Sequence, residues 1–185
     1  SAAGLGLGLG LGLGLGLGSG LGFTTAAESA AAPLPLEMRA TVVRGFGRGG
    51  KLLGCPTANM DMKQIGHLAD TIDAGIYFGW AQVIEPDRKA NGGAPPPIYK
   101  AAISIGWNPQ FGNDEKTVEP HLLNEFPEDF YGQDLRIMIV GFLRPEKAFE
   151  SMEALIDQIQ QDIKDTDAAL EDPDFQKLKE RPFWA

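Results

Sequence analysis

The sequence predicts a mainly antiparallel β-sheet or barrel with one long helix packed across it. Five strand-like segments precede residue 145, and they do not alternate with helices. No glycine follows Gly141, and from Met152 to Ile163 apolar residues recur at helical spacing. Strands grouped ahead of a helix are typical of a sheet or barrel covered by that helix. A doubly wound nucleotide-binding fold is not expected, because it needs strands and helices in alternation.

The five predicted strands are rich in β-branched and aromatic residues. They span residues 38–43, 75–84, 99–107, 116–123 and 135–143. The fifth is apolar on both faces, so we expect it in the centre of the core. Turn-forming residues occupy the connections, for example Asn91-Gly92-Gly93 and Tyr131-Gly132.

The C-terminal helix is predicted to begin after Ser151 and to end at Asp172-Pro173. Ser151 is a suitable N-cap, and Glu153 places a negative charge in the first turn, where the helix dipole favours it. Proline cannot continue a helix, which explains the predicted end.

Residues 1–36 are predicted to be a low-complexity, disordered extension, and residues 37–185 a single domain. Ten of the 24 glycines lie in the first 22 residues, in an uncharged Leu-Gly alternation. Glycine at every second position is unfavourable inside a strand, because ordering it costs the most conformational entropy.

Composition excludes several classes of protein. The chain has 185 residues, 43% of them apolar, and no run suited to a membrane helix. Its one cysteine excludes an internal disulfide and a cysteine-based zinc site. Most of the net charge of −9 falls after residue 144, which leaves a nearly neutral body with a small basic cluster near Arg44. We therefore expect a cytoplasmic monomer that binds a small anion, with no nucleic-acid or membrane partner.

A glycine-rich loop runs from Gly45 to Lys51. It nearly matches two phosphate-binding motifs, but Leu52 stands where a Walker loop has Ser or Thr. Both motifs also need a helix next, and Gly54 and Pro56 prevent one. Consecutive glycine N–H groups can still bind an anion, with the lysine adding charge. The alternative is an ordinary hairpin loop.

Three oxygen-bearing side chains suggest phosphate chemistry beside this loop. Thr57 and Asn59 face the same side of an extended chain and offer neutral oxygens that suit magnesium. The alternative for these two is turn capping. Glu119 is a lone carboxylate in a predicted strand, and it is either a general base or an exposed edge-strand acid. His121 lies on the same face, and we expect it to be structural.

Seven short motifs occur in order between residues 42 and 146. They are VVRGFGRG (42–49), KLLGCPTAN (51–59), GIYFGWA (75–81), SIGWNP (104–109), TVEPH (117–121), DFYG (129–132) and VGFLRPE (140–146). Together they resemble the eukaryotic-type riboflavin kinases, or flavokinases, from about residue 39 to the end of the predicted helix. Cys55 departs from the family pattern, in which an aliphatic residue is more usual. Its size suits a small buried hydrophobic residue.

The resemblance implies a six-stranded antiparallel Greek-key β-barrel with a C-terminal amphipathic α-helix. It implies a kinase that transfers the γ-phosphoryl group of ATP to the 5′-hydroxyl of riboflavin, giving FMN and ADP. Magnesium is the implied metal, with zinc or manganese as alternatives. Two other functions stay open: a flavin-binding barrel without catalysis, and the kinase portion of a longer bifunctional flavin enzyme.

The resemblance also implies roles for individual residues. Glu119 would be the catalytic base, and Thr57 and Asn59 would bind the metal. The nucleotide would be bound by Gly45, Lys51, Thr57, Leu122, Asn124 and Tyr131. The flavin would be bound by Arg144, Lys147 and Phe149.

Overall fold

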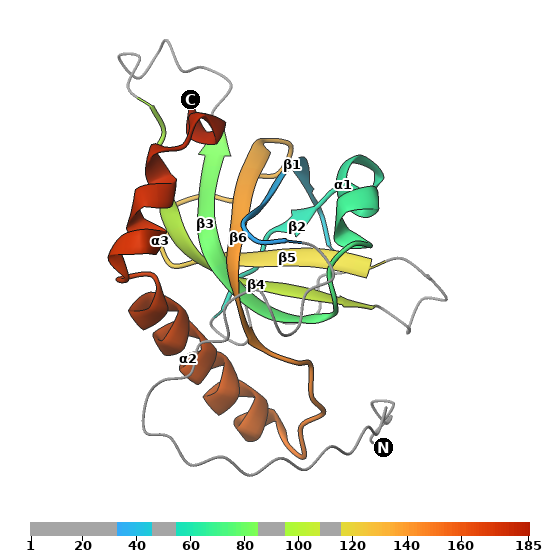
Figure 1. Ribbon diagram of the computed structural model, residues 1–185. Coiled ribbons are helices and arrows are strands. Elements are labelled where there is room, and N and C mark those ends of the chain that lie inside the picture. Colours follow the sequence, from blue (N-terminus) through green and yellow to red (C-terminus); the bar gives the residue numbers. More distant parts are fainter. Residues whose placement is uncertain (1–32, 46–54, 85–94, 108–115) are drawn as a thin grey trace.

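Six antiparallel strands form a nearly closed barrel in the computed structural model, which describes residues 33–45, 55–84, 95–107 and 116–185 (Figure 1). Their order in the sheet is β2-β1-β6-β3-β4-β5. The strands are β1 Leu36–Val43, β2 Asn59–Met60, β3 Gly75–Ile84, β4 Tyr99–Trp107, β5 Lys116–Leu122 and β6 Asp134–Arg144. The first and last strands of this order approach each other where Ala58 N donates to Pro120 O at 2.9 Å. The predicted barrel architecture is confirmed.

All five strands predicted from periodicity are present, with small differences at their ends. Strand β1 begins at Leu36, two residues before the predicted start. Leu34 also packs against the core, although both residues fall in the predicted extension. Residues 1–32 lie outside the described part of the chain.

Among the short elements that were not predicted are one strand and one helix in the first half of the chain. Strand β2 has only two residues, too few for any periodicity to appear. Helix α1, Met62–Ala69, has eight residues and contains Gly66, which lowers its helix propensity. Asp61 caps its first turn by accepting a hydrogen bond from Lys63 N at 3.1 Å.

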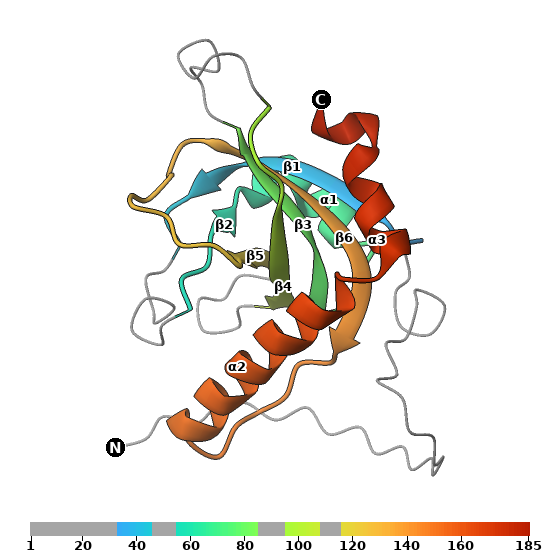
Figure 2. The same cartoon turned by 90° about the vertical axis from the view of Figure 1, so that its left-hand side faces the viewer.

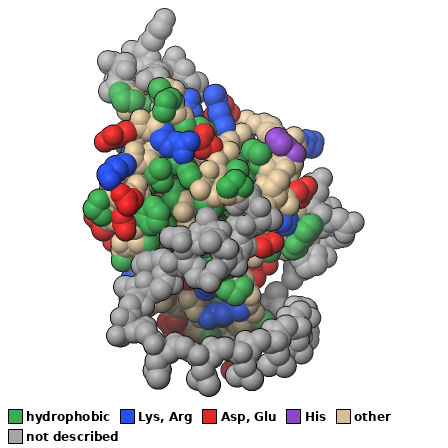
Figure 3. Space-filling view, in the orientation of Figure 1, with side chains coloured by type: hydrophobic (Ala, Val, Ile, Leu, Met, Phe, Trp, Pro, Cys, Tyr) green, Lys and Arg blue, Asp and Glu red, His purple; other side chains and the backbone are tan. Residues whose placement is uncertain are grey.

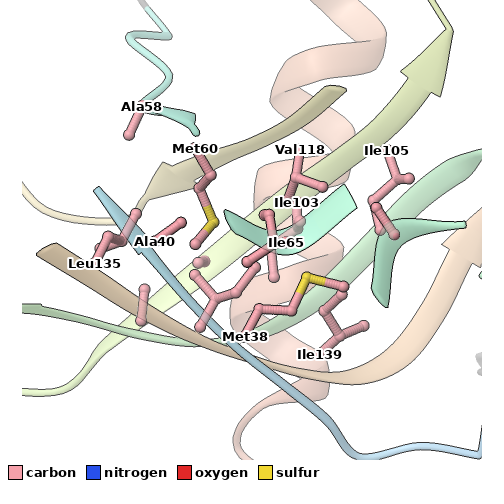
Figure 4. Packing of buried hydrophobic residues seen from close by; sticks show 14 of the residues in the cluster. Met38, Ala40, Ala58, Met60, Ile65, Ile103, Ile105, Val118, Leu135 and Ile139 are labelled. Carbon is pink, nitrogen blue, oxygen red and sulfur yellow. The ribbon is translucent and has the colours of Figure 1, made fainter. Parts of the chain in front are cut away.

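The barrel interior is filled by one face of each long strand. Met38 and Ala40 of β1 and Ile103 of β4 meet Ile139 of β6 there, and Ile65 of α1 packs against them (Figure 4). Strand β6 is buried on both faces, as predicted, because Met138 and Val140 belong to a second cluster outside the barrel.

The C-terminal helices cover that second cluster. Helix α2, Met152–Ala169, runs along the outside of the barrel and projects beyond it (Figures 1 and 2). Ser151 caps it as predicted, and it ends three residues before Asp172. Asp172 instead caps α3, Pro173–Lys177, which is followed by the short 3-10 helices η2, Leu178–Glu180, and η3, Pro182–Trp184. The Trp184 side chain is buried in the cluster.

No helix in the described ranges is both long and apolar enough to cross a membrane. On the face drawn in Figure 3, acidic and basic side chains are interspersed rather than gathered in one basic area.

Candidate active site

The segment from Cys55 to Asn59 lies alongside strand β5. Besides the main-chain bond between Ala58 and Pro120, His121 Nδ1 lies 2.8 Å from the carbonyl oxygen of Pro56, which accepts the bond. This contact gives His121 the structural role expected for it. The two bonds bring together side chains that are far apart in the sequence.

The Thr57 hydroxyl and the Glu119 carboxylate meet at this junction. Thr57 Oγ1 donates to Glu119 Oε2 over 3.4 Å, across 62 positions of the chain. Alternation along β5 buries Val118 and Leu122 and turns Glu119 to the outer face of the barrel, where it is half-buried opposite Ser104 of β4. A candidate metal ligand therefore lies within hydrogen-bonding distance of the candidate base.

The Asn59 side chain packs directly on Gly45. Strand pairing sets Asn59 opposite Val43, two residues before the glycine loop begins. A Cβ atom on Gly45 would lie 2.3 Å from Asn59 Nδ2 and 2.7 Å from Oδ1, so any other residue here would displace this amide. The start of the predicted phosphate loop therefore touches a predicted metal ligand. The rest of that loop, including Lys51, lies outside the described residues.

The oxygen atoms at this junction suit a hard divalent cation. Thr57 is exposed and Asn59 is half-buried, so a ligand can reach both side chains. A hydroxyl, an amide oxygen and a nearby carboxylate match magnesium, which usually takes few protein ligands and shares phosphate oxygens and water. Within the described ranges, no group of three or more His, Cys, Asp or Glu is arranged to hold a metal.

Two of the other predicted nucleotide residues have exposed side chains, and the third is buried in the barrel core. Tyr131 lies at the start of the glycine loop, where the guanidinium carbon of Arg44 is 4.7 Å from its ring centre. Asn124 is exposed, and its amide donates to Glu125 O at 2.9 Å. The Leu122 side chain belongs to the barrel core and is 4% exposed. A nucleotide could reach only the main chain of that residue.

The three predicted flavin residues gather around one aromatic ring. Arg144 ends β6, while Lys147 and Phe149 lie in the segment that joins β6 to α2. We call residues 145–150 the strap. The Arg144 guanidinium carbon is 5.9 Å, and Lys147 Nζ 5.3 Å, from the centre of the Phe149 ring.

The strap also contacts the face of the barrel that carries Glu119. A Cβ atom on Gly106 of β4 would lie 2.1 Å from Glu146 Oε1, so the Glu146 side chain rests on this glycine. Burial raises the pKa of the Glu146 carboxyl, and the Arg144 charge opposes that shift. Gly106 is two residues from Ser104, the strand partner of Glu119. The strap therefore begins close to the candidate base.

Sequence reasoning missed Gln158 and Asp162, two α2 residues that contact this group. Asp162 is 6% exposed and binds Arg144 through two hydrogen bonds. A usable signal existed, because Asp162 stands beside Ile163 on the face of α2 that was predicted to be apolar. A carboxylate in such a position needs a cation, and Arg144 was available.

Cys55 behaves as the small buried side chain that was predicted. It is 8% exposed, and burial, reinforced by the nearby Asp162 charge, raises the pKa of its thiol to about 11. The thiol is therefore protonated and unreactive at neutral pH.

Comparisons with known proteins identify the family of the chain. Residues 32–170 match the family model described as Flavokinase: Riboflavin kinase. Riboflavin kinase from Homo sapiens is 47% identical over 146 residues, covering 79% of this chain and 88% of that protein. The bifunctional riboflavin kinase/FMN phosphatase of Arabidopsis thaliana is 46% identical over 142 residues, covering 77% of this chain and 35% of that protein. The crystal structure of riboflavin kinase from Trypanosoma brucei has a TM-score of 0.59 at 31% identity, covering 80% of this chain and 90% of that chain.

Proposed function

The chain belongs to the flavokinase family and is a riboflavin kinase, and from that premise we propose which of its side chains bind the substrates and which one reacts. The reaction moves the γ-phosphoryl group of ATP to the 5′-hydroxyl of riboflavin. The observation that carries our assignment is the contact between the Thr57 hydroxyl and the Glu119 carboxylate, beside the packing of Asn59 on Gly45.

The nucleotide half of the site consists of Gly45, Thr57 and Asn59. These residues bind the ATP phosphates and the metal ion, for which their neutral oxygens favour magnesium over zinc. When bound, the metal neutralises charge on the phosphate oxygens. The close packing of Asn59 on Gly45 brings the metal ligand and the phosphate loop together. The role of Lys51 in the same loop stays a prediction.

Glu119 is the general base in this proposal. Phosphoryl transfer needs alignment, charge neutralisation and a group that accepts the proton of the attacking alcohol. The carboxylate is half-buried on the outer face of β5, next to Thr57, so it can meet a hydroxyl that approaches the phosphate. It accepts the 5′-hydroxyl proton as that oxygen bonds the γ-phosphorus and the bond from the γ-phosphorus to the ADP oxygen breaks.

The flavin half of the site consists of Arg144, Lys147 and Phe149. A flat, largely apolar isoalloxazine ring is suited to an aromatic surface with a few polar groups beside it. Phe149 offers that surface, and the two cations offer hydrogen-bond donors. Contact between the strap and Gly106 supports their closeness to Glu119.

A flavin-binding barrel without catalysis was the alternative from a different functional class. The curated relatives at high coverage are kinases. Thr57, Asn59 and Glu119, the residues that separate a kinase from a passive binder, are all present and lie together. The catalytic function is therefore the better supported one.

The metal assignment is tested by FMN formation at varied magnesium concentration. Thr57→Ala should raise the magnesium concentration needed for half-maximal rate about tenfold, because one oxygen ligand is lost. Thr57→Ser keeps the hydroxyl and should remain close to wild type. Thr71→Ala is a matched control, since that hydroxyl only bonds Leu68 O at the end of α1. An unchanged magnesium dependence in Thr57→Ala would remove Thr57 from the metal site.

A further inference from the structure

Four polar side chains link the end of β6 and the strap to helix α2, which lie side by side in Figure 2. Asp162 accepts from Arg144 Nε at 2.8 Å and from Arg144 Nη2 at 2.6 Å. Gln158, one turn earlier in α2, donates to Asp162 Oδ1 at 2.8 Å and accepts from Lys147 Nζ at 2.5 Å. Each cation is therefore bound by an α2 side chain, and the two α2 side chains are bonded to each other.

This arrangement holds two positive charges near one aromatic ring. Arg144 and Lys147 both lie within 6 Å of the centre of Phe149, where each gains a cation–π attraction but repels the other. The negative charge of Asp162 offsets that repulsion. Arg144 Nη1 also donates to Pro145 O at 3.0 Å, which fixes the first residue of the strap.

Packing of α2 on the barrel does not by itself require a buried carboxylate. Burying an ion pair costs desolvation energy, and apolar residues of similar size often stabilise a fold as well or better. Helix α2 is already attached elsewhere, because Lys100 of β4 binds Asp167 and Glu171. The charge of Asp162 acts instead on the side chains around Phe149.

We propose that Gln158 and Asp162 are positioning residues for flavin binding, which set Arg144 and Lys147 over Phe149. This inference rests on the proposed flavin role of the latter three residues. Gln158 and Asp162 act through those cations and not by touching riboflavin.

The test is an equilibrium titration of riboflavin fluorescence with the full chain, followed by steady-state kinetics. Asp162→Asn should weaken riboflavin binding about tenfold or more, because a charge-assisted, two-point hydrogen bond is lost. The KM for ATP should stay within about twofold, since the nucleotide half is unaltered. Asp162→Glu keeps the charge and should recover part of the riboflavin affinity.

A matched control lies on the same helix. Gln161 Nε2 bonds Asp165 Oδ1 at 2.7 Å with the same four-residue spacing, but this pair contacts solvent instead of the strap. Asp165→Asn should leave both substrates unaffected. Gln158→Ala keeps the Arg144–Asp162 pair, so it should fold normally and weaken riboflavin binding about threefold, through the lost bonds to Lys147 and Asp162.

Two outcomes would overturn the proposal. One is unchanged riboflavin affinity in both Gln158→Ala and Asp162→Asn, with both variants folded. The other is an equal loss of affinity for riboflavin and ATP, which indicates a general structural role. Phe149→Leu separates this inference from the proposed function. If Phe149→Leu binds riboflavin normally, the flavin assignment itself is wrong. If Phe149→Leu binds riboflavin weakly but the Gln158 and Asp162 variants bind it normally, only the positioning role is rejected.

Discussion

The two halves of the site are built in different ways. The proposed nucleotide half is fixed by the main chain: Ala58 bonds Pro120, Asn59 pairs with Val43, and Asn59 packs on Gly45. The proposed flavin half depends on long side chains, since α2 side chains bind both Arg144 and Lys147 beside Phe149.

This difference follows the chemistry that each half performs. Phosphate and metal must be placed to within a fraction of an ångström, which strand pairing and short side chains achieve at little entropic cost. The proposed flavin half would bind a large flat ring, for which contact area matters more than the position of one atom. Changes in the nucleotide half should therefore alter nucleotide binding and the chemical step, and changes in the flavin half should alter riboflavin affinity.

The largest expected effect is that of Glu119→Gln, at the boundary of the two halves. Removing a general base should lower kcat by about 10²–10⁴-fold, while riboflavin and ATP still bind. Rapid-quench measurement of FMN formed at saturating substrates checks this. A fall of less than about threefold would exclude Glu119 from proton transfer, because even weak general-base catalysis contributes more.

The next largest effect should come from Gly45→Ala. The new methyl group would displace the Asn59 amide and should lower kcat/KM for ATP about 100-fold, as small misplacements of reacting groups do. The melting temperature should change little, because the displaced group is the end of a side chain. Gly66→Ala is the control, since its methyl group would contact nothing within 4 Å. If Gly45→Ala also melts at a clearly lower temperature than the wild type, Gly45 supports the fold in general and not the nucleotide half alone.

The smallest effect concerns Cys55, a buried residue in the segment that carries Thr57. Burial raises its thiol pKa from 9.0 to about 11, so folding favours the neutral thiol. Its contribution to stability is complete below pH 9 and is lost as pH rises through 11. Relative to Cys55→Ala, the wild type should lose about 1 kcal/mol of unfolding free energy between pH 7 and pH 10.

Urea titrations of both proteins at the two pH values measure this difference. The same burial should make the thiol slow to react with iodoacetamide at pH 8. An equal pH dependence in wild type and Cys55→Ala would show that the thiol is not desolvated in the folded protein.

The sequence predicts the long strands well because runs rich in apolar, β-branched and aromatic residues stand out between turn-forming residues, as in Gly75–Ile84 and Tyr99–Trp107, most of whose residues are buried. It does not predict β2, whose two residues pair with β1 only because the barrel brings them there. Local pattern likewise cannot place Thr57 beside Glu119, since that contact depends on how the barrel closes.

The site residues follow the same division. Gly45, Thr57, Asn59 and Glu119 stand out because their residue types are unusual for their positions. Asp162 is a carboxylate on the predicted apolar face of α2, which is a usable signal, whereas Gln158 carries none, because polar residues are common on an amphipathic helix and only the fold reveals which of them meets the strap. Gly106 also carries no local signal, and its importance appears only where Glu146 rests on it.

The most direct test of the two-half account measures nucleotide and riboflavin binding in the same pair of variants, Gly45→Ala and Phe149→Leu. We predict that Gly45→Ala weakens binding of magnesium–ADP about tenfold or more and leaves the riboflavin Kd unchanged. Phe149→Leu should weaken riboflavin binding by a similar factor without altering nucleotide affinity. If either variant weakens both ligands equally, the site is a single unit and the division proposed for it is wrong.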